Sequence, residues 1–491
     1  MSEYVVSVGM EVHAELMTES KMFCRCPVAF GGMPNTRTCP VCLGLPGTLP
    51  VPNEAAVEMV IKTALALNCT VPEDSVFHRK NYFYPDLPKG FQVSQYGDTN
   101  PIGYNGWLEI PAADGGTKRV KIRRVHLEED TGKLMHLPGG GSGVDYNRAG
   151  VPLMEIVTEF PPDIESPDEA REYMVQLRAI LIYLGVCDGK LEQGSMRCEP
   201  NISVRKKGSE TYGTKTELKN LNSFRSVQLG ISYELERQSA LLEEGGVVRQ
   251  ETRGWNDKTL VSYLMRVKES EAEYRYFPCP DLIPMHFDEA RISRIRATLP
   301  ELPLAKQLRY ENDFGLSTYD AGVLVSEQYW GAFFEKCVEL GADAKLACNW
   351  MNGEFARLLN ENGQVGLIEG EGIEDKPASH VRPAHIVELI DLISSGKISG
   401  KMAKEVFEEC FGSGKMPSHV VEEQGLSVIS DSGAIETAAQ EVLDANPTQL
   451  EQYRAGKESL IGFFVGQVMK KTEGRADPQT VQAVLRDLLN K

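Results

Sequence analysis

The chain has 491 residues, of which 42% are hydrophobic and 25% are charged, a composition typical of soluble globular proteins. No apolar run approaches the roughly 18 residues of a membrane-spanning helix, and the first residues lack the features of a signal peptide, so we expect neither a membrane protein nor a secreted one. The net charge of −18 argues against a generic nucleic-acid binder, although it is compatible with local basic patches.

Four cysteines lie close together near the N-terminus, with the spacing C-x-C-x12-C-x2-C: Cys24, Cys26, Cys39 and Cys42. Four thiolates in two short loops are typical ligands of a structural zinc ion. Because four sulfurs leave no open coordination position, we expect this zinc to stabilise the fold and not to take part in catalysis. The other seven of the 11 cysteines are isolated, which favours a reducing cytoplasm over a disulfide framework.

Strand and helix patterns alternate up to about residue 290 and predict one large α+β unit. Period-two alternation predicts strands within residues 5–16, 119–127, 196–204 and 215–221. Helical patterns span residues 53–68 and 168–184. The second helix follows Ser166 and Pro167, which are typical N-cap and first-turn residues.

The pattern becomes helical from about residue 291 and stays helical to the end of the chain. Gly400 and the helix-breaking residues 411–417 predict a hinge. We therefore expect three domains, at residues 1–292, 293–400 and 401–491, of which the last two are all-helical. Within the first domain, the glycine-rich residues 138–143 predict a hairpin tip and not a phosphate-binding loop, because no Gly-Lys-Ser/Thr sequence follows them.

The predicted strand at residues 5–16 places potential metal ligands on one face. Because alternate residues of a strand share a face, Glu11, His13 and Glu15 point to the same side. Their neighbours on the other side are apolar and predict a buried core: Met10, Val12, Ala14 and Leu16.

Other predicted strands combine carboxylates with cations. The residues concerned are Glu128, Glu129, Glu155, Arg197, Glu199, Lys215, Glu217 and Lys219. Carboxylate oxygens suit Mg²⁺, and Mg²⁺ together with lysine and arginine suits a nucleoside triphosphate. The alternative is that these carboxylates face solvent and that His13 is a hydrogen-bonded structural residue.

Long motifs in order along the chain resemble the GatB family, which supplies one of the subunits of the tRNA-dependent amidotransferase. They include GMEVHAEL, NTRTCPVCLGLPGTLPVPN, HLEEDTGK, DYNRAGVPLMEIV, GSMRCEPNIS, GTKTELKNLNSF and FFVGQVMKKTEGRADP. The resemblance implies a large mixed-sheet cradle domain related to the catalytic domain of glutamine synthetase. It also implies a helical domain and a small helical tail of the GatB/YqeY type that contacts tRNA.

The same resemblance implies an ATP-dependent carbon–nitrogen ligase that acts on misacylated Glu-tRNA(Gln) or Asp-tRNA(Asn). ATP phosphorylates the side-chain carboxylate of the amino acid on the tRNA, and ammonia then displaces phosphate to give the amide. The ammonia arrives through a tunnel from a partner amidase subunit, and a small clamp subunit completes the heterotrimer. The chain itself has no Walker A motif and no amidase signature, so it needs this partner.

The resemblance also assigns the metal ligands. One Mg²⁺ ion falls on His13, Glu129 and Glu155, and a second falls on Glu11, Glu199 and Glu217. The four cysteines fall on the family's Zn²⁺ site.

Two lysines match positions of the ammonia tunnel, Lys80 and Lys89, and Glu129 matches the residue at the tunnel exit. We accordingly predict Glu129, Glu155, Lys80, Lys89 and Arg197 as catalytic residues, and Arg197, Lys215 and Lys219 as contacts of ATP. Two other functions compete with this prediction: a free-standing amide ligase for a small carboxylate, and a noncatalytic zinc-stabilised RNA-binding subunit.

Overall fold

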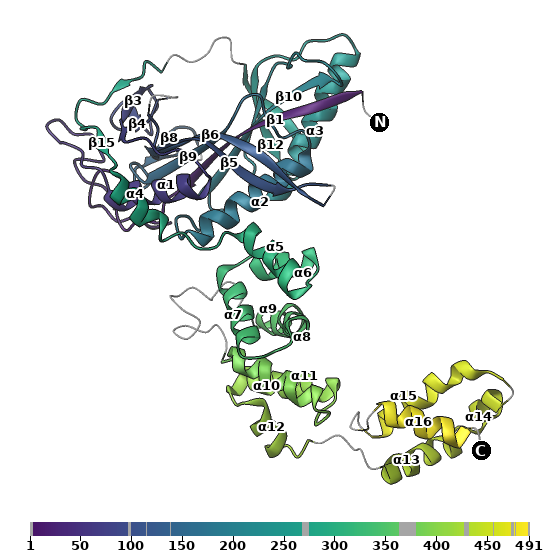
Figure 1. The fold of residues 1–491 in the computed structure, drawn as a ribbon. Coiled ribbons are helices and arrows are strands. Elements are labelled where there is room, and N and C mark those ends of the chain that lie inside the picture. The colour runs from purple at the N-terminus through teal and green to yellow at the C-terminus, as the bar shows by residue number, and fades with distance from the viewer. Residues whose placement is uncertain are drawn as a thin grey trace. The chain divides into compact units, whose positions relative to one another are not determined.

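The computed structural model describes residues 3–96, 100–113, 115–137, 139–267, 274–362, 380–426, 432–454, 456–472, 476 and 478–489. The chain divides into two compact units, Met1–Lys306 and Gln307–Lys491 (Figure 1). Among the described helices, none is long and apolar enough to cross a membrane.

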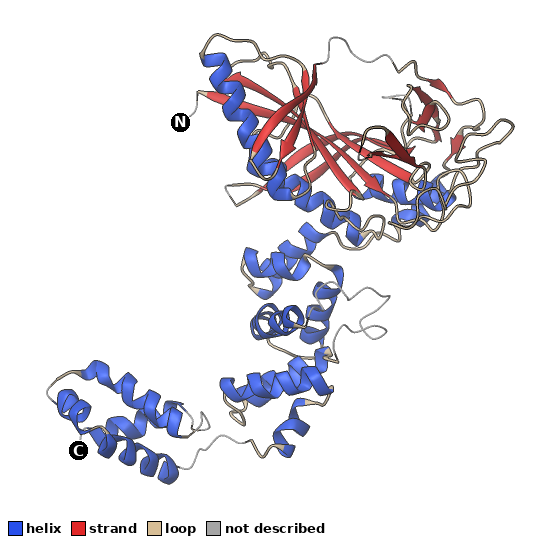
Figure 2. Cartoon of the chain, turned by 180° about the vertical axis from the view of Figure 1, so that it is seen from behind, coloured by secondary structure: helices blue, strands red, loops and turns tan. Residues whose placement is uncertain are grey.

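An eight-stranded sheet forms the centre of the first unit (Figure 2). In spatial order its strands are β13 (Val261–Val267), β12 (Glu251–Asn256), β11 (Thr216–Lys219), β10 (Met196–Lys206), β1 (Tyr4–Glu15), β9 (Pro152–Thr158), β6 (Thr117–Glu129) and β5 (Gly103–Pro111). Strands β11 and β12 run parallel, and the other neighbouring pairs run antiparallel. The sheet is therefore mixed, which confirms the predicted α+β class.

Three helices pack against one face of this sheet: α1 (Glu54–Ala66), α2 (Pro167–Tyr183) and α3 (Phe224–Glu243). The Ser166 hydroxyl accepts a hydrogen bond from the Glu169 backbone N–H at 3.1 Å, and Asn53 caps α1 in the same way. Such caps satisfy backbone N–H groups that the start of a helix leaves unpaired. Both predicted helices are confirmed. Helix α4 (Glu289–Arg296) packs against α1.

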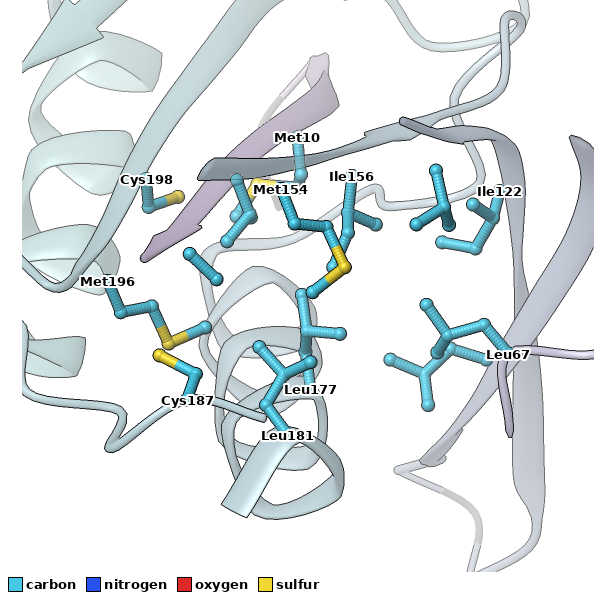
Figure 3. Packing of buried hydrophobic residues seen from close by; sticks show 14 of the residues in the cluster. Met10, Leu67, Ile122, Met154, Ile156, Leu177, Leu181, Cys187, Met196 and Cys198 are labelled. Atoms are coloured by element: carbon cyan, nitrogen blue, oxygen red, sulfur yellow. The ribbon is translucent and has the colours of Figure 1, made fainter. Parts of the chain in front are cut away.

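The apolar residues of the strands point toward these helices and form the core (Figure 3). Met10, Val12, Met154 and Met196 are each at most 1% exposed. Side chains from α2, including Leu177, pack against them. The alternate residues of the same strands are polar and face the other side of the sheet, as the alternation predicts.

Three small sheets complete the first unit. They pair β3 (His78–Asn81) with β4 (Phe91–Ser94) and β14 (Phe277–Pro278), β2 (Asp74–Ser75) with β15 (Met285–His286), and β7 (Lys133–His136) with β8 (Ser142–Asp145). Gly139, Gly140 and Gly141 join β7 to β8 with φ of +93°, +92° and +95°, a region that glycine adopts without steric cost. These residues form a hairpin tip as predicted, and Pro138 lies outside the described residues.

From residue 303 onward the described chain is helical, as predicted. The elements are α5 (Pro303–Phe314), α6 (Thr318–Val325), α7 (Gln328–Glu339), α8 (Ala344–Trp350), the π-helix η1 (Met351–Phe355), α9 (Ala356–Glu361), α10 (Pro383–Ser394), α11 (Gly400–Ser413), α12 (Pro417–Glu423), α13 (Ser432–Ala445), α14 (Pro447–Arg454), the 3-10 helix η2 (Glu458–Leu460), α15 (Ile461–Lys471) and α16 (Pro478–Leu489).

The helices of the second unit form two separate hydrophobic cores. One contains Phe333, Phe355 and Phe407, and the other contains Phe464 and Leu485. Helix α11 packs into the same core as α10, so the predicted boundary at residue 401 falls inside a packed region. A boundary after α12 fits this packing better, and the division into three domains stays a prediction.

Candidate active site and metal centre

The polar face of the large sheet lines a hollow of about 550 Å³. Side chains from β1, β9, β6, β10 and β11 form its floor, and Lys80 and Tyr82 next to β4 form part of its wall. A hollow of this volume lies within the range of about 300–1,000 Å³ that is usual for small-molecule sites. This size is sufficient for a nucleotide.

Carboxylates and histidines from three neighbouring strands meet on this floor. Strand pairing places His13 opposite Glu155, and Glu155 opposite His126. Potential ligand atoms of Glu11, His13 and Glu155 lie within 4.8 Å of one another, and so do those of His126, Glu128 and Glu155. Glu155 therefore belongs to both groups.

The two histidines contact the same two carboxylates. His13 Nε2 lies 3.5 Å from Glu128 Oε1 and 3.4 Å from Glu155 Oε2. His126 Nε2 lies 3.3 Å from Glu155 Oε2. The other ring nitrogen of His126, Nδ1, is buried and has no hydrogen-bond partner among the described residues. We call the set Glu11, His13, His126, Glu128 and Glu155 the acid–histidine cluster.

The cluster perturbs the ionisation of its members. Burial and the nearby Glu155 carboxylate raise the pKa of Glu11 to about 7. Burial disfavours a charged His13, but the carboxylates of Glu128 and Glu155 outweigh it and raise the pKa of His13 well above its usual value. The pKa of Glu155 lies well below its usual value despite burial, because His126 and His13 stabilise its charge.

The donor set of the acid–histidine cluster fits a hard divalent cation. Mg²⁺ and Mn²⁺ prefer carboxylate oxygens and accept imidazole, and the spread of the ligand atoms suits octahedral coordination with some sites left for water. A divalent cation would replace the protons on the two imidazoles as the counter-charge of the carboxylates.

The second predicted set of magnesium ligands lies in the same hollow but is organised differently. Glu199 is directly opposite Glu11 in the strand register. The ammonium group of Lys219 contacts both Glu199 and Glu217, at 2.5 Å and 3.2 Å. The structure therefore groups Glu11 with His13 and Glu155, and pairs Glu199 and Glu217 with a lysine.

Glu129 does not join the acid–histidine cluster, in contrast to the predicted set of His13, Glu129 and Glu155. Consecutive residues of a strand point to opposite faces, so the cluster receives Glu128 and the other face receives Glu129. There Glu129 forms an ion pair with Lys89 and accepts a hydrogen bond from the Val93 backbone N–H at 2.9 Å. Both charged residues line a second pocket, which the cysteines share.

Arg197 lines the hollow, but its guanidinium group is already occupied. Nε donates to the Gly194 carbonyl at 2.8 Å, and Nη2 donates to Glu15 at 2.8 Å and to the buried Asp130. Lys215, in contrast, is exposed, precedes β11 and does not line the hollow. Of the two, Arg197 alone reaches the site.

Lys80 points into the hollow beside a group of tyrosines. Its Nζ lies 5.1 Å from the centroid of the Tyr274 ring, a cation–π contact. Burial opposes its charge, but Glu128, Tyr276 and Glu155 together raise the pKa of Lys80 above its usual range. Lys80 therefore stays charged at neutral pH.

The sequence pattern did not single out several residues that line the hollow: Tyr96, Arg124, His126, Arg266, Tyr274 and Tyr276. Alternation within β6 would have placed Arg124 and His126 on the face of Glu128. The tyrosines come from separate segments, and sequence alone offers no signal that brings them together.

The four predicted zinc ligands do come together. The Sγ atoms of Cys24, Cys26, Cys39 and Cys42 lie within 4.8 Å of one another, which is compatible with one tetrahedral ion. Lys21 is buried, and its Nζ contacts Cys42 Sγ at 3.6 Å. The Cys24 thiol, the Cys39 backbone N–H and the Lys21 ammonium outweigh burial and lower the pKa of the Cys42 thiol to about 4. A ready thiolate fits a zinc site.

Comparison with known proteins covers both units. Residues 6–293 match the model of the GatB/GatE catalytic domain, and residues 332–489 match the model of the GatB domain. Over 489 residues the chain is 50% identical to the GatB-type subunit of the aspartyl/glutamyl-tRNA(Asn/Gln) amidotransferase of Caldanaerobacter subterraneus subsp. tengcongensis, with 100% of both chains covered. The protein of the same name from Moorella thermoacetica is 52% identical over 99% of this chain and 100% of its own length.

Proposed function

Because this chain belongs to the GatB family, we propose that it is the subunit of a tRNA-dependent amidotransferase that activates and amidates the amino acid on misacylated tRNA. The substrates we propose are Glu-tRNA(Gln), Asp-tRNA(Asn) or both, in agreement with the names of the relatives. The observation that carries the proposal is the convergence of the acid–histidine cluster in a hollow that is large enough for a nucleotide.

The chemistry needs an activation step because a free carboxylate is a poor acyl donor. In the first step, a carboxylate oxygen of the aminoacyl side chain takes the γ-phosphoryl group of ATP, and ADP leaves. In the second step, ammonia adds to the acyl carbon, the bond from carbon to the phosphate oxygen breaks, and phosphate leaves as the nitrogen loses a proton. Both steps build negative charge that cations in the hollow stabilise.

Glu11, His13 and Glu155, with His126 and Glu128, would hold Mg²⁺ in this site. The ion supplies charge neutralisation on the phosphoryl oxygens when it is bound. Lys80 adds a fixed positive charge on the wall of the hollow, where Tyr274 and its neighbours exclude part of the water. Exclusion of water matters because an acyl phosphate hydrolyses readily.

Ammonia delivery is the part of the proposal that involves a partner. The Lys89–Glu129 ion pair lies in the second pocket, on the other side of β6 from Glu128, and we propose that ammonia from an amidase subunit passes this pair. A small third subunit would complete the heterotrimer. The relation of the mixed sheet to the catalytic domain of glutamine synthetase belongs to the same proposal.

Two further features have a place in this function. The cysteine quartet would hold a structural Zn²⁺ ion near the second pocket. The basic end of the last helical segment, with Lys470, Lys471 and Arg486, would contact the tRNA in an otherwise acidic protein, so salt should weaken the complex steeply. We place the reaction in the cytoplasm, where reduced cysteines and translation coincide.

The test is ATP-dependent amidation by the chain purified with its partner subunits, with misacylated tRNA and ammonium as substrates. Glu155→Ala should abolish amide formation and leave the zinc content normal, because Glu155 belongs to both metal-capable groups and lies apart from the cysteines. Glu109→Ala is the matched control, since Glu109 is on β5 and pairs with Arg119 outside the hollow. A fully active Glu155→Ala complex would refute the assignment.

A further inference from the structure

Arg124 is the arginine of the hollow whose hydrogen-bonding groups are least used. It lies on β6, on the same face as His126 and Glu128, and it lines the hollow. Its Nη2 lies 3.4 Å from Glu155 Oε1, a long contact. Its Nε is buried and has no hydrogen-bond partner among the described residues.

The other cations on the floor are committed to carboxylates or are exposed. Arg197 is held by Glu15 and Asp130, and Lys219 is held by Glu199 and Glu217 in the same way. Arg266 lies on the exposed edge strand β13. Arg124 thus differs from Arg197, which the sequence favoured, by offering unused N–H groups beside the acid–histidine cluster.

A buried guanidinium N–H without an acceptor is unfavourable, and such groups are rare in folded proteins. The arrangement is explained if an anionic ligand supplies the missing acceptors. A planar guanidinium presents paired N–H groups whose spacing matches two oxygens of a phosphate. A triphosphate that enters a floor lined with carboxylates also needs a cation that those carboxylates have not already neutralised.

We propose that Arg124 binds the phosphoryl group that is transferred in the activation step, beside the cation held by the acid–histidine cluster. This inference rests on the proposed function and names a residue of that same site. Arg124 donates from its unused N–H groups to the non-bridging oxygens of the γ-phosphate. Its contact with Glu155 keeps the guanidinium at the edge of the metal site, within reach of a phosphate that the metal also binds.

The experiment uses the complete complex and compares Arg124→Ala with wild type. Phosphate release from ATP is measured with misacylated tRNA and ammonium, together with the affinity for a non-hydrolysable ATP analogue and for Mn²⁺. Arg119→Ala is the matched control, because Arg119 is on the same strand, is 63% exposed and pairs with Glu109 outside the hollow.

We expect Arg124→Ala to lower kcat for phosphate release about 100-fold or more, as the loss of a group that stabilises transition-state charge does elsewhere. Mn²⁺ affinity should stay within about threefold of wild type, and added guanidinium should restore part of the activity, which it would not do for a merely structural arginine. Arg124→Lys, which keeps the charge but not the fork, should lose about tenfold, and it serves as the test if the alanine variant fails to fold.

The outcomes separate the two levels of the proposal. Normal kcat in both Arg124 variants, or a loss of kcat that merely follows lost Mn²⁺ binding, would overturn the role of Arg124 and leave the proposed function standing. An absence of ATP-dependent phosphate release by the wild-type complex would overturn the proposed function and this inference with it.

Discussion

Glu128→Gln and Glu129→Gln form a pair of variants that tests the assignment of the metal ligands. The sequence resemblance assigns Glu129 to the metal with His13 and Glu155, whereas the structure brings Glu128 to that group. We expect Glu128→Gln to weaken the binding of a divalent cation strongly and Glu129→Gln to leave it nearly unchanged.

The size of the effect follows from the contacts of Glu128. Its Oε1 lies 3.5 Å from His13 Nε2, and its Oε2 accepts a hydrogen bond from Ser94 Oγ at 3.0 Å, so the carboxylate is held at the cluster. At an effective dielectric constant of about 20, a carboxylate about 4 Å from a divalent cation contributes roughly 8 kcal/mol before desolvation is subtracted. Changes that merely disturb the orientation of a ligand already cost about 10- to 100-fold in affinity, so the loss of a ligand charge should cost at least about 100-fold.

The assay is Mn²⁺ binding, followed by electron paramagnetic resonance on the complete complex, with zinc content measured on the same samples. Glu129→Gln should change the Mn²⁺ affinity by less than about threefold, because its charge lies on the other side of the strand and is already paired with Lys89. If Glu129→Gln weakens Mn²⁺ binding as much as Glu128→Gln does, the assignment from the structure is wrong and the assignment from the sequence is restored.

Three further predictions concern the zinc site and the fold. Lys21→Met should weaken zinc binding about 10- to 100-fold in competition with a chelator, because the buried ammonium stabilises the Cys42 thiolate; unchanged affinity would refute this role. Glu234→Gln should lower the free energy of unfolding in urea at pH 7 by about 3 kcal/mol, since Glu234 is fully buried between two arginines. The pKa of Glu234 is lowered, so its stabilising contribution is present above its usual value of 4.5 and lost as the pH falls through the lower folded-state value; an equal deficit at pH 7 and in acid would contradict this. Gly106→Ala should destabilise the first unit in the same urea assay by about 1–3 kcal/mol, because an added Cβ would lie 2.5 Å from the Leu67 carbonyl oxygen; wild-type stability would show that the backbone yields freely.

Alternation along single strands made much of the site predictable from the sequence. It placed Glu11 and His13 on one face and Met10 and Val12 in the core, and the structure confirms both. The first turn of α2 was equally clear, because Ser166 provides its cap locally. These features depend on contacts between residues that are near one another in the sequence.

The assignments that differ depend on parity at a strand end and on partners from distant segments. Glu128 and Glu129 are chemically identical and both buried, so composition cannot decide which one faces the hollow. The strand also carries a register shift between Ile122 and Arg124, which breaks simple counting from its start. The engagement of Arg197 with Asp130 joins residues 67 positions apart, which no local pattern reveals.

The end of β6 acts as a partition one residue thick. Glu128 belongs to the chamber with the imidazoles, and the next residue, Glu129, belongs to the chamber with the sulfur atoms. Consecutive Cα atoms are about 3.8 Å apart, so the two chambers are joined by a link that can neither stretch nor slip. Any event that pulls on the lysine-bound carboxylate therefore reaches its neighbour through covalent bonds, and the wall between the chambers is also their shortest line of communication.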